Sequence, residues 1–341
     1  MNVEQLKAKL ESPQYDFLRT DEKLGRNLFL LGVGGSYAYG TEDETSDVNA
    51  IGITLNSKKE VLTGRSFDRF YEPTTETVIF SFSKIISLLL DGNPATVELL
   101  GLKDDHYLYM SPIAHELLYS RKIFLSKKTV EAYEKFIRKA LYAIKQKADG
   151  ENIRRDRERL LVDNMNAIRN NQGNKYAKLP SDSIYMYLDD VGNNAGADIF
   201  MDVTLSHYPL RDYVSLLEDL HAMVDSFGKP GRRKGDALTL DNISKHCMHL
   251  VRLYLTLFDI LDKQDIITYR GLDRKLLMEV KRGRFLDAEG KPNDEFFKLV
   301  DDFDKRLNVL KATTKLPDEP DYSLIDNFVM SVNERIIRGE I

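Results

Sequence analysis

The stretch Asn27-Leu-Phe-Leu-Leu-Gly-Val-Gly-Gly-Ser36 decides the fold of the first part of this chain. Its apolar run closes on a pair of glycines, which is typical of a buried strand that passes into a turn and a short helix. Further out, residues 46–55 alternate in character as a strand does, and residues 76–82 form a third β-rich run. The chain up to about residue 120 therefore reads as mixed α/β.

The character of the sequence changes after residue 120. Helical spacing of apolar residues dominates there, with few strand signals. We therefore expect a small α/β domain over residues 1–120 and a mainly helical domain over residues 121–341. The segments with helical spacing are residues 129–169, 210–226, 239–263, 272–282 and 321–339.

Composition excludes several classes of protein. The chain has 341 residues, a formal net charge of −5 and a single cysteine, Cys247, which rules out a disulfide framework and a cysteine-based zinc cluster. The longest apolar runs are far shorter than the ~20 residues of a membrane helix. The first residues lack the pattern of a signal peptide. We expect a cytoplasmic protein that does not enter the membrane, and the mild acidity argues against a charge-only nucleic-acid binder.

The turn after the first strand has the chemistry of a phosphate site. Gly34 and Gly35 let the backbone approach a triphosphate, and Ser36 adds a hydroxyl donor. About ten residues later, Asp47 and Asn49 occupy positions i and i+2 of the predicted strand and would share one face. Two carboxylates at such positions, joined by a third from a neighbouring strand, could hold Mg²⁺ for phosphoryl transfer.

These residues resemble the nucleotidyltransferases of the DNA polymerase β superfamily. More narrowly, the chain is similar to the nucleotidyltransferase family associated with RNA repair pathways, and the resemblance spans roughly residues 28–322. The marks that carry it are Gly34-Gly35-Ser36-x-Ala38-Tyr39-Gly40-Thr41, Ser46-Asp47-x-Asn49, Lys84, Asn93-Pro94-x-x-x-x-Leu99-Leu100, Lys245-His246-x-x-His249-Leu-x-Arg252-Leu253, Lys281-Arg282-Gly283 and Leu316-Pro317-x-x-Pro320-Asp321.

The resemblance implies a metal-dependent enzyme. It would transfer a nucleoside monophosphate from an NTP, most commonly ATP, to an acceptor hydroxyl, with an RNA or tRNA 3′ end as the implied acceptor. Asp47 would bind Mg²⁺ or Mn²⁺. Residue 49 would also bind the metal and help to activate the attacking hydroxyl. Glu76 is the candidate for the third acidic ligand, with an ordinary loop glutamate as the alternative; Glu72 and Asp68 are weaker substitutes.

Asn49 departs from the family pattern, which has a second aspartate there. A neutral amide oxygen is a poor substitute for a carboxylate on a hard divalent cation. Three interpretations stay open. The asparagine is an engineered isosteric change, it marks a natural pseudoenzyme, or the other ligands suffice.

Two basic segments in the second half are candidates for binding phosphate. Lys245, His249 and Arg252 fall at i, i+4 and i+7 and so form one stripe of a helix. They would contact the phosphates of a nucleotide, or else serve as structural and solvated residues. A glycine-rich loop carries further cations that would contact a nucleic-acid backbone, or else lie solvated at the surface: Arg232, Arg233 and Lys234.

Two other functions compete with the repair-type enzyme. One is a nucleotide- or RNA-binding protein that has lost catalysis through Asn49. The other is a toxin-type nucleotidyltransferase that modifies tRNA or protein. The sequence does not distinguish their acceptors.

Overall fold

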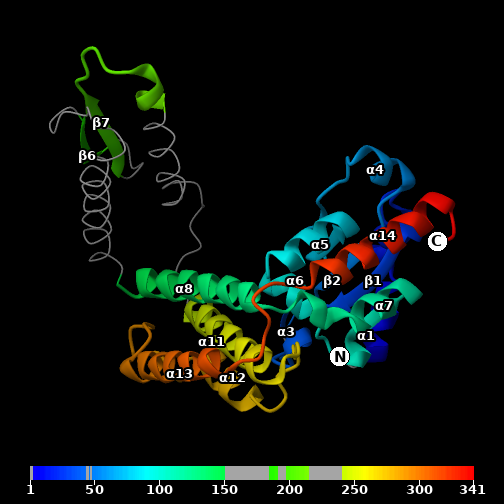
Figure 1. The fold of residues 1–341 in the computed structure, drawn as a ribbon. Helices are drawn as coiled ribbons and strands as arrows, with labels where there is room; N and C mark the ends of the chain where they lie inside the picture. Colours follow the sequence, from blue (N-terminus) through cyan, green and yellow to red (C-terminus); the bar gives the residue numbers. More distant parts are fainter. Residues whose placement is uncertain (1–2, 44–45, 47, 150–183, 191–196, 215–239) are drawn as a thin grey trace. The chain divides into compact units, whose positions relative to one another are not determined.

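The computed structural model describes residues 3–43, 46, 48–149, 184–190, 197–214 and 240–341 (Figure 1). The chain divides into two compact units. Met1–Ile144 and Leu240–Ile341 form the larger unit, and Lys145–Thr239 forms the smaller one. The boundary predicted after residue 120 lies inside the larger unit, so the two predicted domains remain a prediction about the organisation of the chain.

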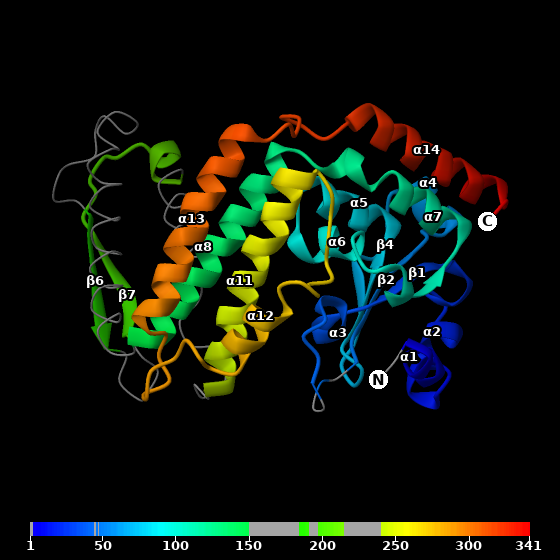
Figure 2. The ribbon, with the colours of Figure 1, turned by 90° about the horizontal axis from the view of Figure 1, so that it is seen from below.

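A five-stranded mixed sheet forms the centre of the first part of the chain (Figure 2). The strand order is β3-β4-β2-β1-β5, with β2 and β4 parallel and the other neighbours antiparallel. This arrangement confirms the predicted mixed α/β class. The strands are β1 (Leu28–Val33), β2 (Ala50–Thr54), β3 (Arg69–Glu72), β4 (Thr77–Ser81) and β5 (Tyr107–Met110).

Both faces of the sheet are covered, which explains why β1 is apolar along its length. Leu31, Ala50 and Ile79, from three neighbouring strands, pack on one face against the segment that holds α1 (Val3–Leu10) and α2 (Phe17–Thr20). The opposite face belongs to the main hydrophobic core. A strand covered on both faces reads as a continuous hydrophobic run rather than an alternating one.

Short helices follow the strands, and the one after β1 agrees with the turn and short helix expected there. Strand β4 passes directly into α5, and the Asn93 side chain accepts a hydrogen bond from the Ala95 N–H at the start of α6. Asn93 therefore caps the N-terminus of α6. These helices are α3 (Gly35–Tyr39), α4 (Lys58–Thr63), α5 (Phe82–Leu90), α6 (Pro94–Leu99) and α7 (Pro112–Tyr119).

Long helices complete the larger unit, and α8, α11 and α13 lie side by side (Figures 1 and 2). The sequence analysis missed α13, because eight acidic and basic residues in its first thirteen mask the apolar positions Phe296, Val300 and Leu307, which are buried. The long helices are α8 (Lys127–Asp149), α11 (Leu240–Lys263), α13 (Asp294–Thr313) and α14 (Tyr322–Arg338), with the shorter α12 (Arg274–Lys281) between them in sequence.

The smaller unit contains a two-stranded antiparallel sheet that the helical prediction missed. Strands β6 (Ile184–Asp190) and β7 (Ala197–Val203) pair from Ile184 with Val203 to Asp190 with Ala197. Both strands are rich in residues with high β propensity, which outweighs the helical pattern around them. Arg232, Arg233, Lys234 and the predicted helices over residues 150–169 and 215–226 lie outside the described residues.

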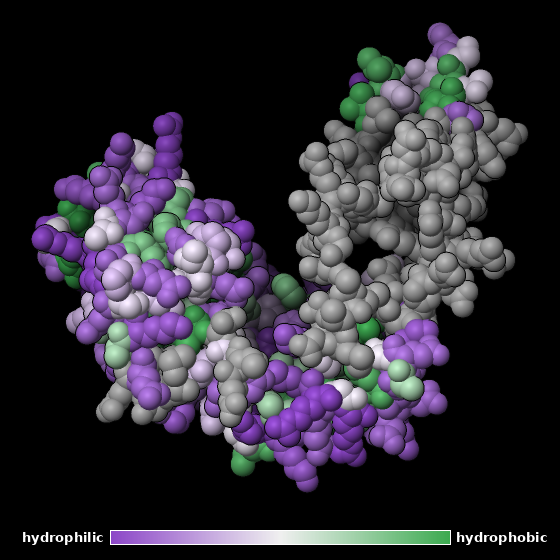
Figure 3. Space-filling view, turned by 180° about the vertical axis from the view of Figure 1, so that it is seen from behind, coloured by the Kyte–Doolittle hydropathy of each residue, from purple (hydrophilic) through white to green (hydrophobic). Residues whose placement is uncertain are grey.

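The described surface is predominantly hydrophilic on the face shown in Figure 3, with hydrophobic residues in small separate patches. Among the described helices, none combines the length and the apolar character that crossing a membrane requires.

Candidate active site

The glycine–serine turn begins where β1 ends. Gly34 is extended and caps α3, while Gly35 has a φ of 59°, in the left-handed region that favours glycine. A Cβ added to Gly35 would lie 3.2 Å from Asn49 Nδ2. The glycine pair is therefore required both by the backbone conformation and by the close approach of Asn49.

Asn49 and Glu76 meet beside this turn, although 27 residues separate them in sequence. The Gly34 N–H donates to the Asn49 carbonyl at 2.8 Å. Asn49 Nδ2 donates to Glu76 Oε2 at 3.0 Å. The structure thus brings together four of the predicted site residues, Gly34, Gly35, Asn49 and Glu76, and Asp47 lies outside the described residues.

Two details differ from the predicted strands around this pair. Strand β2 begins at Ala50, so Asn49 lies one residue before the strand rather than within it. Glu76 precedes β4 and has a φ of 47°, which few residues other than glycine adopt. Backbone strain of this kind is concentrated at functional sites, where the surrounding structure maintains it.

The donor atoms at this position fit a hard divalent cation. Asn49 Oδ1 is buried and has no hydrogen-bond partner among the described residues, and Glu76 contributes a carboxylate. Oxygen donors of these two kinds are the ligands that Mg²⁺ and Ca²⁺ take in proteins. The described residues contain no group of three or more His, Cys, Asp or Glu side chains arranged as a metal site, and Asn49 supplies an amide where a carboxylate would add charge.

The predicted basic stripe lies on α11, and its three members differ in environment. Lys245 is exposed, His249 is half-buried and Arg252 is buried. Arg252 Nη1 donates to Glu98 Oε2 at 2.5 Å, and its guanidinium lies 3.7 Å from the centre of the Tyr39 ring. A phosphate contact by Arg252 would therefore require this guanidinium to leave Glu98.

Glu98 is the residue that the sequence analysis overlooked. It lies on α6 and is only 3% exposed. Its carboxylate accepts hydrogen bonds from Tyr39 (2.9 Å), Arg252 (2.5 Å) and Thr256 (3.3 Å). Because burial raises the pKa of Tyr39, that hydroxyl remains protonated and donates to Glu98. Glu98 thus joins Tyr39, the last residue of α3, to α11. In the sequence, the sign of a buried functional role was a charged residue between two apolar residues of a predicted helix.

His249 is neutral at physiological pH. Burial, together with the nearby Arg252 charge, lowers its pKa from 6.5 to about 4. Arg252 Nη2 lies 2.8 Å from His249 Nδ1, and because arginine can only donate, that nitrogen accepts. Protonation of His249 would break this hydrogen bond.

The stability of the protein should depend on pH through His249. The unfolded state binds more protons than the folded state between pH 6.5 and about 4, so the stability that neutral His249 contributes is complete above pH 6.5 and is lost as the pH falls through this window. We expect His249→Gln to remove up to about 3 kcal/mol of the decrease in unfolding free energy over this range. Urea titrations of the unmodified chain and of His249→Gln at pH 7.5 and 4.5 measure these unfolding free energies. If both proteins lose the same free energy between the two pH values, His249 is not the group responsible.

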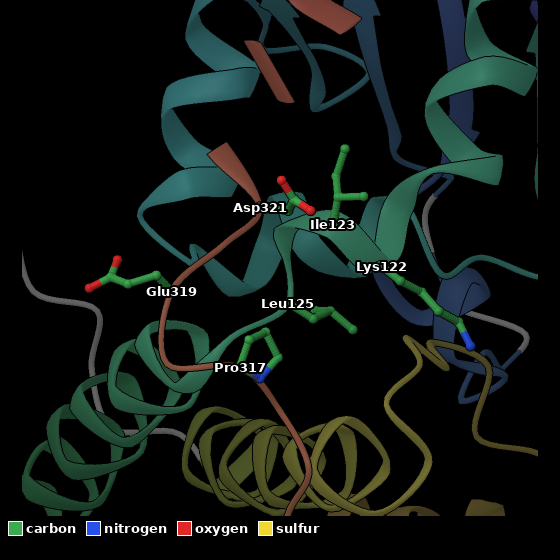
Figure 4. Close-up of a pocket in the computed structure, with 6 residues that line it drawn as sticks. All are labelled: Lys122, Ile123, Leu125, Pro317, Glu319 and Asp321. Carbon is green, nitrogen blue, oxygen red and sulfur yellow. The ribbon is translucent and has the colours of Figure 1, made fainter. Parts of the chain in front are cut away.

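A pocket lies away from these residues (Figure 4). It lies between the short helical segment Arg121–Phe124 and the segment that precedes α14. Main-chain hydrogen bonds from Lys127 to Pro317 and from Asp321 to Ile123 join the two segments. The mark at residues 316–321 is therefore a structural connection to the start of α8. The residues that line the pocket are Lys122, Ile123, Leu125, Pro317, Glu319 and Asp321.

Comparison with known proteins identifies the class. A mixed sheet with a glycine–serine turn beside a polar pair agrees with a match to a family model that covers residues 11–331, nearly the whole chain. The chain is thus a member of the DNA polymerase β superfamily. Within it, the chain belongs to the RNA repair pathway DNA polymerase beta family, RlaP. No curated protein and no solved structure matches it. Family membership suggests nucleotidyltransferase activity.

Proposed function

We propose that this protein transfers a nucleoside monophosphate from an NTP to an acceptor hydroxyl, with pyrophosphate as the leaving group. The observation that carries the proposal is the contact of Asn49 and Glu76 with each other beside the Gly34–Gly35 turn. The contact places oxygen atoms that suit a metal ion next to a glycine turn that suits a phosphate group. The chain that carries both belongs to the polymerase β superfamily. ATP is the NTP that we expect.

The residues of the turn would bind the β- and γ-phosphates. The Gly34 N–H already donates to the Asn49 carbonyl, so the phosphate contacts fall to Gly35 and Ser36 rather than to both glycines. The first N–H groups of a helix have no partner within the helix and point toward the space before it. Lys245 and His249 remain candidates for additional phosphate contacts.

Asp47, Asn49 and Glu76 would hold Mg²⁺ or Mn²⁺. A bound divalent cation supplies charge stabilisation of the transferring phosphoryl group and lowers the pKa of a coordinated hydroxyl. Glu76 is kept in place by Asn49 Nδ2, and the unpartnered Asn49 Oδ1 is the second candidate ligand. With an amide in place of a carboxylate, this ligand set has one negative charge fewer than the family pattern, which weakens cation binding.

We infer that the acceptor is RNA, and an exposed face of α8 supports this choice. Lys135, Arg138 and Lys139 lie exposed on this helix, with no ion pair to any described residue, and the sequence from 135 to 148 has no acidic residue. Phe136 and Tyr142 are 39% and 47% exposed on the same helix. Cations interleaved with exposed aromatic rings suit phosphates and bases of a single strand.

Reversal of two of these charges tests the acceptor. We expect Lys135→Glu with Lys139→Glu to weaken binding of single-stranded RNA at least about tenfold and to make the salt dependence shallower by about 1.4 log units per log unit. Fluorescence anisotropy with a labelled oligonucleotide measures both. The matched control, Lys58→Glu with Lys59→Glu on α4, changes the net charge equally. Equal loss in both variants would argue against α8 as the binding face.

The function itself is tested with α-labelled NTPs, Mg²⁺ or Mn²⁺ and total RNA, followed by separation of RNA and protein. Label on RNA supports the proposal, and label on protein assigns a different acceptor. NTP binding without label in either fraction supports a catalytically disabled binding protein, the alternative to which the amide at position 49 points. Absence of NTP binding overturns the proposal.

A further inference from the structure

The backbone that follows α3 is attached to the α12 region through consecutive carbonyl groups. Four carbonyls in a row, at residues 39–42, each accept a hydrogen bond from this region, which passes next to α3 (Figure 2). The pairs are Arg270 N–H to Tyr39 O (3.0 Å), Arg274 Nε to Gly40 O (2.8 Å), Lys281 Nζ to Thr41 O (3.0 Å) and Arg274 Nη2 to Glu42 O (3.4 Å).

Lys281 contacts two residues of the segment that follows α3, Thr41 and Asp43. Toward the glycine–serine turn, Thr41 accepts from Lys281 and its own N–H donates to the Ser36 carbonyl at 3.0 Å. Toward β2, Lys281 Nζ lies 2.6 Å from Asp43 Oδ2, and Asp43 Oδ1 accepts from Ser46 Oγ at 3.0 Å. One ammonium group therefore links Ser36 with Ser46, the residue directly before Asp47.

The charges at this contact favour a fixed arrangement. Backbone carbonyl oxygens carry partial negative charge, and the cationic side chains of Arg274 and Lys281 donate charge-assisted hydrogen bonds to three of them. The Lys281 side chain is only 14% exposed, so solvent screens its interactions with Thr41 and Asp43 much less than those of a surface lysine. The Lys281 side chain thus differs from a lysine in an ordinary surface ion pair, which is exposed to solvent and contacts only a carboxylate.

We propose that Lys281 and Arg274 are positioning residues of the nucleotide site. They fix residues 39–43, which contact both Ser36 and Ser46, and thereby set the glycine–serine turn relative to Ser46. This inference rests on the proposed function and adds α12 to the residues on which nucleotide binding depends. It also gives a physical role to the Lys281-Arg282-Gly283 mark of the sequence.

The test compares Lys281→Met, which removes the ammonium group, with Lys281→Arg, which keeps the positive charge and supplies N–H donors from a guanidinium. Lys305→Met on α13 is the control, because Lys305 forms an exposed ion pair with Asp302. Two readouts are taken: amide hydrogen exchange of peptides covering residues 34–43 without nucleotide, and the dissociation constant for ATP with Mg²⁺. Thermal unfolding verifies that each variant is folded.

For Lys281→Met we expect exchange in residues 34–43 to accelerate roughly tenfold and ATP affinity to fall roughly tenfold, as loss of a charge-assisted hydrogen bond implies. Lys281→Arg should recover most of both, and Lys305→Met should change neither. Unchanged exchange in Lys281→Met, or faster exchange with unchanged ATP affinity, overturns the inference. If the unmodified chain binds no ATP, the proposed function fails with the positioning role, while the exchange data still decide whether Lys281 fixes the loop.

Discussion

Replacement of Glu98 by alanine is expected to lower the free energy of unfolding by about 3–5 kcal/mol. Glu98 is 3% exposed and Arg252 is 7% exposed, so removal of the carboxylate leaves an uncompensated charge in the interior. The change also leaves the Tyr39 hydroxyl and Thr256 Oγ1 without their acceptor. Urea titration followed by circular dichroism measures the effect.

The double variant Glu98→Leu with Arg252→Met separates the charge from the packing. Removing both partners of a buried ion pair in favour of apolar groups is often nearly neutral, so this variant should recover at least half of the loss. A decrease of less than about 1 kcal/mol for Glu98→Ala would show that the carboxylate is solvated and that α3 is not joined to α11 through it.

Asn49→Asp is expected to make the protein dependent on divalent cations. Nδ2 of Asn49 lies 3.0 Å from Glu76 Oε2, and an aspartate would place two carboxylates at that separation. Without metal, their repulsion should destabilise the fold by roughly 1–3 kcal/mol. With Mg²⁺ or Mn²⁺, the added charge should strengthen cation binding and raise nucleotidyl transfer on the order of 100-fold.

Thermal unfolding with and without Mn²⁺, alongside the label-transfer assay, measures both effects. Asn308→Asp on α13 is the matched control, since it adds the same charge at an exposed position. We expect a melting temperature below that of the unmodified chain in chelator and above it in Mn²⁺. If the melting temperature of the Asn49→Asp variant is the same with and without Mn²⁺, the proposed ligand set is contradicted.

The turn and the polar pair could be predicted because their signals are local. A glycine pair that ends an apolar run specifies a turn, and Asn93 before Pro94 specifies a helix start. Asn49 and Glu76 could be placed together because each adjoins a strand of one sheet, and β2 and β4 are neighbours in that sheet. The positions of Asn49 before β2 and of Glu76 before β4, each outside its predicted strand, needed the structure.

Glu98 and Lys281 could not be assigned from sequence because their partners are distant. Lys281 reads as part of a basic cluster until its ammonium group is seen 2.6 Å from Asp43, 238 residues earlier. Arg252 likewise reads as a phosphate ligand until its partner Glu98 is known. Spacing along one helix predicts which residues share a face, but it carries no information on which distant segment covers that face.

The distance in sequence between Glu98 and Arg252 has a consequence for protein synthesis. The two residues are 154 positions apart. At ribosomal rates of about 5–20 residues per second, Arg252 is made about 8–30 s after Glu98. The sheet and α3 therefore leave the ribosome well before the helices that neutralise Glu98. During this interval the nascent chain has an unpaired carboxylate and uncovered apolar surface, which is the state that chaperones bind.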